Sequence, residues 1–167
     1  MRRRFITFAL AVACVALPAG GLRAQSRKGT VLEVRGLITS LALTEADLAA
    51  LPRHTLKASA HGVSGEFSGV SLADLLHLVS APSGEALRGK ELADYVVVDA
   101  RDGYRVVFSL AELDAGFTDR VAVLADRMDG KAMDSASGPL HLIVPDEKRP
   151  ARWVRQVTRI SLGRAAP

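Results

Sequence analysis

GPLHLIVPDEKRPARWVRQVTRI, the stretch from Gly138 to Ile160, carries more information about the fold than any other part of the sequence. Residues alternate in hydropathy from Pro139 to Val144, which is typical of a β-strand. A basic segment follows, and a last strand is expected within Arg152–Ile160. The stretch therefore predicts two strands joined by a basic loop.

The second of these strands is not regular. A strict alternation would place Trp153 and Val157 on the same side as Arg155 and Arg159. Apolar and charged side chains do not share one face of a half-buried strand, so a bulge or a bend is expected near this position.

The N-terminus has the pattern of a secretory signal peptide. Arg2–Arg4 are basic, and the apolar run Phe5–Leu17 is too short to span a membrane comfortably. Leu22–Ala24 forms an imperfect cleavage site, so we expect a signal segment at residues 1–24 and export to the periplasm or beyond the cell. Lipoprotein processing at Cys14 is the lesser alternative, because Ala11 stands where such sites usually have Leu.

The charge balance argues against nucleic-acid binding. The sequence has 22 Lys and Arg residues and 18 Asp and Glu residues, for a formal charge of +4. Four of the basic residues and none of the acidic ones precede Gln25, so residues 25–167 are formally neutral. The excess of basic over acidic residues from Asp146 to Pro167 is therefore a local patch rather than a nucleic-acid-binding surface.

Cys14 is the only cysteine in the sequence, and it lies within the expected signal segment. Without it, residues 25–167 can form no disulfide and offer no thiolate to a metal ion. This length is sufficient for a single domain with its own hydrophobic core.

Short strands dominate the rest of the pattern. Thr44, with Asp47 three residues later, predicts a capped helix, and Ser71 predicts another. In the second helix, Leu72, Leu75 and Val79 lie on one apolar face. The predicted fold class is α+β, with a mixed or antiparallel sheet and few short helices. Other strands are expected at Val31–Val34, Leu56–Ala60, Tyr95–Ala100, Tyr104–Phe108 and Val121–Ala125, and Ser40–Leu43 is a further short apolar run.

Three stretches taken together resemble a known family. They are FSGVSLADLL (Phe67–Leu76), YVVVDARDGYRVVFSLAEL (Tyr95–Leu113) and the stretch Gly138–Ile160. Their order is similar to G-V-P-L-x-D-L-L, a D-G-Y hairpin, G-P-L-R-L-x-x-P and R-W-V-K-x-V-x-x-I in the oxidoreductase molybdopterin-binding domain family. The resemblance covers roughly Val31 to Leu162 and implies the sulfite oxidase-like fold, molybdopterin as cofactor and an oxidoreductase activity.

One departure from the family pattern affects the chemistry. The resemblance implies that a cysteine thiolate holds molybdenum from the loop before the first helix. The corresponding segment here, LKASAHGVSGEF (Leu56–Phe67), has no cysteine. Because Ser or His does not replace a soft anionic thiolate, oxygen-atom transfer at a cysteine-held molybdenum is not expected. Whether the chain is an enzyme is left open.

His61 is a candidate cofactor-binding residue, since it lies in a glycine-flanked segment at the place of the family's metal-binding loop. The alternative is an ordinary histidine on a surface loop. His54 and His77 are expected at the surface, and His141 is expected to be exposed on its alternating strand. No two histidines have the i, i+4 spacing of a helical metal motif, so no metal site is predicted.

The basic loop supplies the other candidates. The resemblance implies that Lys148, Arg149, Arg152 and Arg155 approach the pterin and its phosphate, which an arginine can bind through two hydrogen bonds. The alternative is a solvated turn in which the arginines face outward and Trp153 packs inward.

These observations leave two main hypotheses for function. In the first, the chain is an exported relative of oxidoreductases that binds molybdopterin without the thiolate. In the second, it is a cofactor-free binding or sensory accessory protein for a small anion or a protein partner. A purely structural exported domain ranks third. None of the three needs nucleic acid, or a membrane span once the signal is removed.

Overall fold

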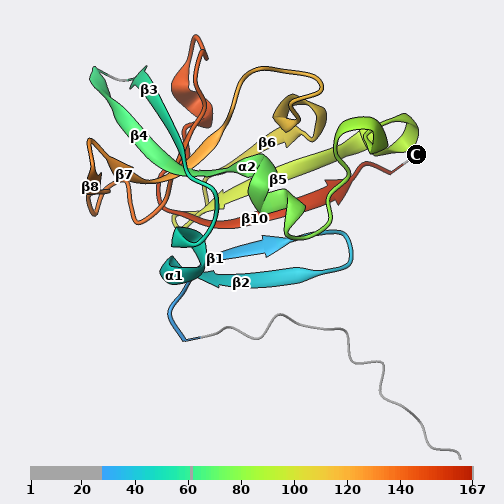
Figure 1. Cartoon of the computed structure of the whole chain (residues 1–167), viewed down its shortest axis with the longest axis horizontal. Coiled ribbons are helices and arrows are strands. Elements are labelled where there is room, and N and C mark those ends of the chain that lie inside the picture. The colour runs from blue at the N-terminus through green and yellow to red at the C-terminus, as the bar shows by residue number, and fades with distance from the viewer. Residues whose placement is uncertain (1–27, 61, 167) are drawn as a thin grey trace, which may run out of the picture.

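The computed structural model describes residues 28–60 and 62–166, so the expected signal segment and His61 lie outside the described residues. Two β-sheets make up this part of the chain (Figure 1). Neighbouring strands of the first sheet are antiparallel except for the parallel pair of β1 and β10. Its strand order is β2 (Ser40–Thr44), β1 (Thr30–Arg35), β10 (Val157–Arg164), β5 (Asp94–Ala100) and β6 (Arg105–Ser109).

The second sheet is antiparallel, and β7 is central to it because it pairs with β4, β8 and β9. Among the described residues, the α-helices are the short α1 (Glu45–Ala49) and α2 (Leu72–His77). Mostly antiparallel strands with few short helices confirm the predicted α+β class. The strands of this sheet are β3 (His54–Ala60), β4 (Val63–Ser71), β7 (Val123–Met128), β8 (Lys131–Ala132) and β9 (His141–Ile143). The 3₁₀ turns are η1 (Gly84–Ala86), η2 (Gly89–Ala93), η3 (Ala111–Leu113) and η4 (Pro150–Arg152).

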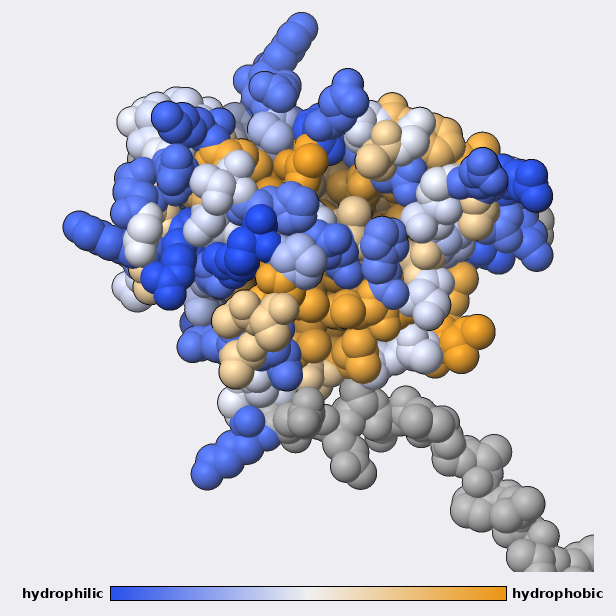
Figure 2. Space-filling view, viewed as in Figure 1, coloured by the Kyte–Doolittle hydropathy of each residue, from blue (hydrophilic) through white to orange (hydrophobic). Residues whose placement is uncertain are grey.

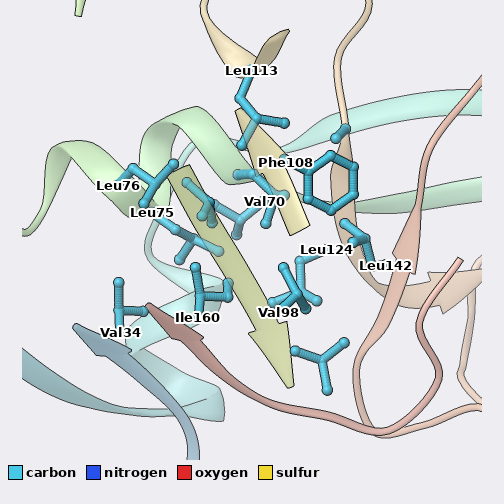
Figure 3. Packing of buried hydrophobic residues seen from close by; sticks show 14 of the residues in the cluster. Val34, Val70, Leu75, Leu76, Val98, Phe108, Leu113, Leu124, Leu142 and Ile160 are labelled. Carbon is cyan, nitrogen blue, oxygen red and sulfur yellow. The ribbon is translucent and has the colours of Figure 1, made fainter. Parts of the chain in front are cut away.

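The larger hydrophobic core draws its side chains from both sheets and from α2 (Figure 3). Leu75 of α2, Val98 of β5 and Leu142 of β9 are fully buried there. Ser71 caps α2 by accepting a hydrogen bond from the backbone of Asp74, which confirms the predicted helix start. The predicted apolar face of this helix is therefore the face that packs against the sheets.

A second, smaller cluster covers the other face of the second sheet. Along β7, Leu124 packs into the larger core, whereas Val123 and Ala125 belong to the smaller cluster together with Phe67 and Ile143. The centre of this sheet is thus buried on both faces. Some segment must cover the second face, and the chain after β9 does so.

Some predicted boundaries differ from the observed ones. β3 begins at His54, before the expected start at Leu56. β7 continues to Met128, past the expected end at Ala125. β10 begins only at Val157, because Gln156 has a left-handed backbone (φ 51°) and the pairing with β5 shifts register after Val157. This confirms the expected bend.

Exposed hydrophobic side chains gather over β1, β2 and the turn between them, below a mostly hydrophilic region (Figure 2). Leu37 and Ile38, on that turn, are 47% and 95% exposed. No helix within the described part of the chain is both long enough and apolar enough to cross a membrane.

Candidate binding cavity and its relatives

The stretch Gly138–Ile160 crosses from the second sheet to the first, and its loop between β9 and β10 rises to the top of Figure 1 in orange-red. Backbone hydrogen bonds hold the returning chain against β9: Leu142 N donates to Val154 O at 2.8 Å, and Val157 N donates to Leu140 O at 2.9 Å. The indole Nε1 of Trp153 donates to Val144 O at 2.7 Å. The crossing segment therefore covers the second face of the sheet.

Three aromatic rings meet beneath this segment. The centroid of Phe67 lies 5.8 Å from that of Trp153 and 6.3 Å from that of His141, and those of His141 and Trp153 are 6.2 Å apart. All three pairs are edge-to-face, the arrangement that ring quadrupoles favour. The expectation that His141 is exposed is wrong: it is 8% exposed, because Phe67 and Trp153 cover the side of β9 that alternation assigned to solvent.

The imidazole of His141 is buried without a hydrogen-bond partner on either ring nitrogen. Burial, together with the positive charge of Arg155, lowers its pKa from 6.5 to about 4, although Asp134 acts in the opposite direction. The ring is therefore neutral at pH 7, with one donor and one acceptor unsatisfied. Each such group costs about 1–3 kcal/mol when nothing in the fold pairs with it.

His141 forms part of the wall of a cavity of about 370 Å³. Lys131 and Arg155 also line this cavity, and neither forms an ion pair with another residue in the described range. The carboxylates of Asp129 and Asp134 line it too, but each accepts a backbone hydrogen bond, from Glu66 N at 2.8 Å and from Ser137 N at 2.7 Å. The remaining lining residues are Ala60, Phe67, Met128, Ala132, Met133, Ser137 and Trp153.

Arg152 lies outside this cavity, although it is only three residues from Arg155. Its guanidinium donates to Glu147 and, at 3.1 and 3.2 Å, to both carboxylate oxygens of Glu112. It also stacks over Phe108, with its Cζ 4.4 Å from the ring centroid. Because two carboxylates already occupy it, the Arg152 guanidinium holds the crossing segment to η3.

The structure separates the four basic residues predicted to bind the pterin. Arg155 lines the cavity, and Arg152 belongs to the ion cluster. Lys148 and Arg149 are exposed on the loop before η4. Cofactor binding by these four residues and by His61 stays a prediction.

The comparisons with known proteins agree with this architecture. The model of the family described as the oxidoreductase molybdopterin-binding domain matches residues 23–166. The chain belongs to this family.

Among solved structures, the molybdopterin-binding domain described here resembles the crystal structure of the sulfane dehydrogenase SoxCD from Paracoccus pantotrophus, with a TM-score of 0.59 and 22% sequence identity. The match covers 86% of this chain and 40% of that chain, so it shows a shared fold over part of a longer protein. No curated protein matches the chain.

The donor set does not fit a molybdenum atom held by the protein. The one cysteine of the sequence, Cys14, precedes the matched region. In the described ranges, no group of three or more His, Cys, Asp or Glu residues could hold a metal ion. His141 stands where the family pattern G-P-L-R-L has arginine, so a neutral ring replaces a permanent cation. The residues present offer two cations to an anion and no thiolate to a metal.

Several residues that line the cavity carry no signal in the sequence. Met128, Lys131 and Met133 flank the Asp129-Gly130 turn, where nothing in the sequence indicated a site. The one available signal was His141 itself, a polar residue within the apolar stretch PLHLIV. Buried polar groups are normally hydrogen-bonded, so an orphaned one needs an explanation.

Replacing Arg152 is expected to destabilise the protein. Arg152→Gln removes hydrogen bonds to Glu147, whose side chain is only 10% exposed, and to Glu112. We expect a loss of about 2 kcal/mol in the free energy of unfolding, measured with urea, because bonds to charged groups are worth more than neutral ones. The exposed Arg155→Gln control should change it by less than about 0.5 kcal/mol. Equal effects of the two substitutions would show that the ion cluster does not hold the crossing segment.

His141 is expected to make stability depend on pH. Its pKa is lower in the folded protein than in the unfolded chain, so its contribution is complete above pH 6.5 and is lost as the pH falls to about 4. That shift corresponds to about 3 kcal/mol. Below about pH 4, protonation of His141 should cause no further loss in the free energy of unfolding.

The measurement compares urea unfolding of the wild type and His141→Gln between pH 7 and 4. Glu33 and Asp74, whose pKa values hydrogen bonds lower against the opposing effect of burial, also lose stability in acid, but they do so in both proteins. The wild type should therefore lose about 3 kcal/mol more than the variant. Parallel losses would mean that His141 is solvated in the native state.

Proposed function

We propose that the chain is an exported binding protein, periplasmic or secreted, which holds a small anionic ligand in the His141 cavity and performs no reaction at a cysteine-held molybdenum. The observation that carries this proposal is the cavity itself. It combines a buried imidazole that lacks partners with two cations that form no ion pair among the described residues.

The electrostatics of the cavity support an anion rather than a cation. Lys131 and Arg155 are free to bind, whereas one oxygen of each lining carboxylate already accepts a hydrogen bond. Arginine adds direction as well as charge, since its planar group can donate two parallel hydrogen bonds to a carboxylate or phosphate. A bound anion would also offset the positive field of Arg155 on His141.

Export rests on the N-terminal pattern of arginines, a short apolar run and small residues near Ala24. Export and the absence of a protein thiolate are compatible with a binding or sensory accessory role outside the cytoplasm.

A second candidate is molybdopterin binding without a protein thiolate, which the family match over residues 23–166 favours. In that case the pterin would bind through its anionic group, with Arg155 and Lys131 as the available cations. The described residues would supply no thiolate to the metal. We therefore rank this candidate below cofactor-free binding.

Trp153 makes the proposal directly testable, because it lines the cavity and is the only tryptophan in the sequence. Purified protein would be titrated with phosphate, sulfate and a series of organic acids while its fluorescence is followed. At least one anion should cause a saturable change and raise the unfolding temperature. At about 100 times its Kd, such a ligand adds about 2.7 kcal/mol to the free energy of unfolding.

Arg155→Gln should weaken that binding about tenfold, which corresponds to about 1.4 kcal/mol. The matched control is Arg101→Gln, since Arg101 is an exposed arginine on the turn between β5 and β6 and lies outside the cavity lining. A response that survives Arg155→Gln unchanged would place the anion elsewhere. No response to any anion would leave a protein partner as the remaining binding function.

A further inference from the structure

The wall of the His141 cavity has two chemically different parts. Phe67, Met128, Met133 and Trp153 form an apolar region, and three of these pack with the smaller core cluster as partly buried residues. Charged side chains, two basic and two acidic, line another part of the wall. A ligand that fills the cavity must therefore present both an apolar body and a charged group.

The charges limit the ligand to a small net charge. Lys131 and Arg155 are balanced in number by Asp129 and Asp134. Because two carboxylates also line the cavity, a dianion would meet more repulsion there than a single carboxylate placed between the two cations. An inorganic anion could use the cations but would leave the apolar wall in contact with water.

The apolar part is suited to a ring. Phe67, His141 and Trp153 all line the cavity and already pack edge-to-face with one another. A planar aromatic ligand extends such a set with further edge or face contacts, and thioethers such as those of Met128 and Met133 also interact favourably with ring edges. A volume of about 370 Å³ lies near the small end of ligand pockets, which run from about 300 to 1,000 Å³.

We propose that the cavity binds a small aromatic monocarboxylate, with its ring against Phe67 and Trp153 and its carboxylate between Lys131 and Arg155. This inference rests on the proposed function and specifies its ligand class. The aromatic part of the ligand is a single ring or a pair of fused rings.

The test is a fluorescence titration of Trp153 with four probes. Benzoate and 4-hydroxybenzoate carry both required parts. Cyclohexanecarboxylate keeps the charge but lacks the aromatic ring, and benzamide keeps the ring but lacks the charge. We expect the aromatic acids to bind at least about tenfold more tightly than either control compound, and phosphate to bind more weakly still.

Substitutions of the two cations test where the carboxylate of the ligand binds. Lys131→Gln and Arg155→Gln should each weaken benzoate binding about tenfold while leaving the weak binding of benzamide unchanged. Lys90→Gln and Arg101→Gln, which remove exposed cations away from the cavity, should have no effect. Chemical-shift changes on benzoate addition should be centred on the side chains of His141 and Met133.

The outcomes separate this inference from the proposed function. Equal affinities for benzoate and cyclohexanecarboxylate, or for benzoate and benzamide, would overturn the aromatic carboxylate assignment. Binding of phosphate or an aliphatic acid that depends on Arg155, without binding of the aromatic acids, would overturn it and leave the proposed function intact. No Arg155-dependent binding of any anion would overturn both.

Discussion

Trp153 anchors the chain at the point where it passes from one sheet to the other, and much of the structure depends on that anchor. Its indole donates to Val144 O and packs against both hydrophobic clusters, so it joins the end of β9 to the returning segment. Leu142 and Val157 then align that segment by backbone hydrogen bonds. β10 consequently enters the first sheet between β1 and β5.

The same crossing creates the site. Because β10 starts only after the left-handed Gln156, the preceding residues are free of a regular strand and point in different directions. Arg152 turns toward two glutamates and Phe108, whereas Arg155 remains unpaired beside the cavity. One arginine of this loop thus stabilises the fold, whereas the other remains available to a ligand. Burial beneath Trp153 keeps His141 neutral and without a partner.

Local patterns were sufficient for most of the fold. Alternation placed the β5–β6 hairpin, Ser71 marked the start of α2, and the family motifs indicated the sulfite oxidase-like architecture. The errors concern long-range packing. Alternation cannot reveal that both faces of β9 are covered, so His141 was expected at the surface. The partner of Arg152, Glu112, lies 40 residues away in sequence, and the cavity brings together side chains from β4, the β7–β8 turn, β9 and the crossing segment.

The central claim is that this member of the molybdopterin-binding domain family works as a binding module without molybdenum. Its most direct test is metal and pterin analysis of the protein, purified from a host that synthesises molybdopterin, beside a cysteine-bearing member of the family made in the same host. The account predicts molybdenum and pterin in the cysteine-bearing protein and neither in this one. Stoichiometric molybdenum and pterin in both proteins would contradict it.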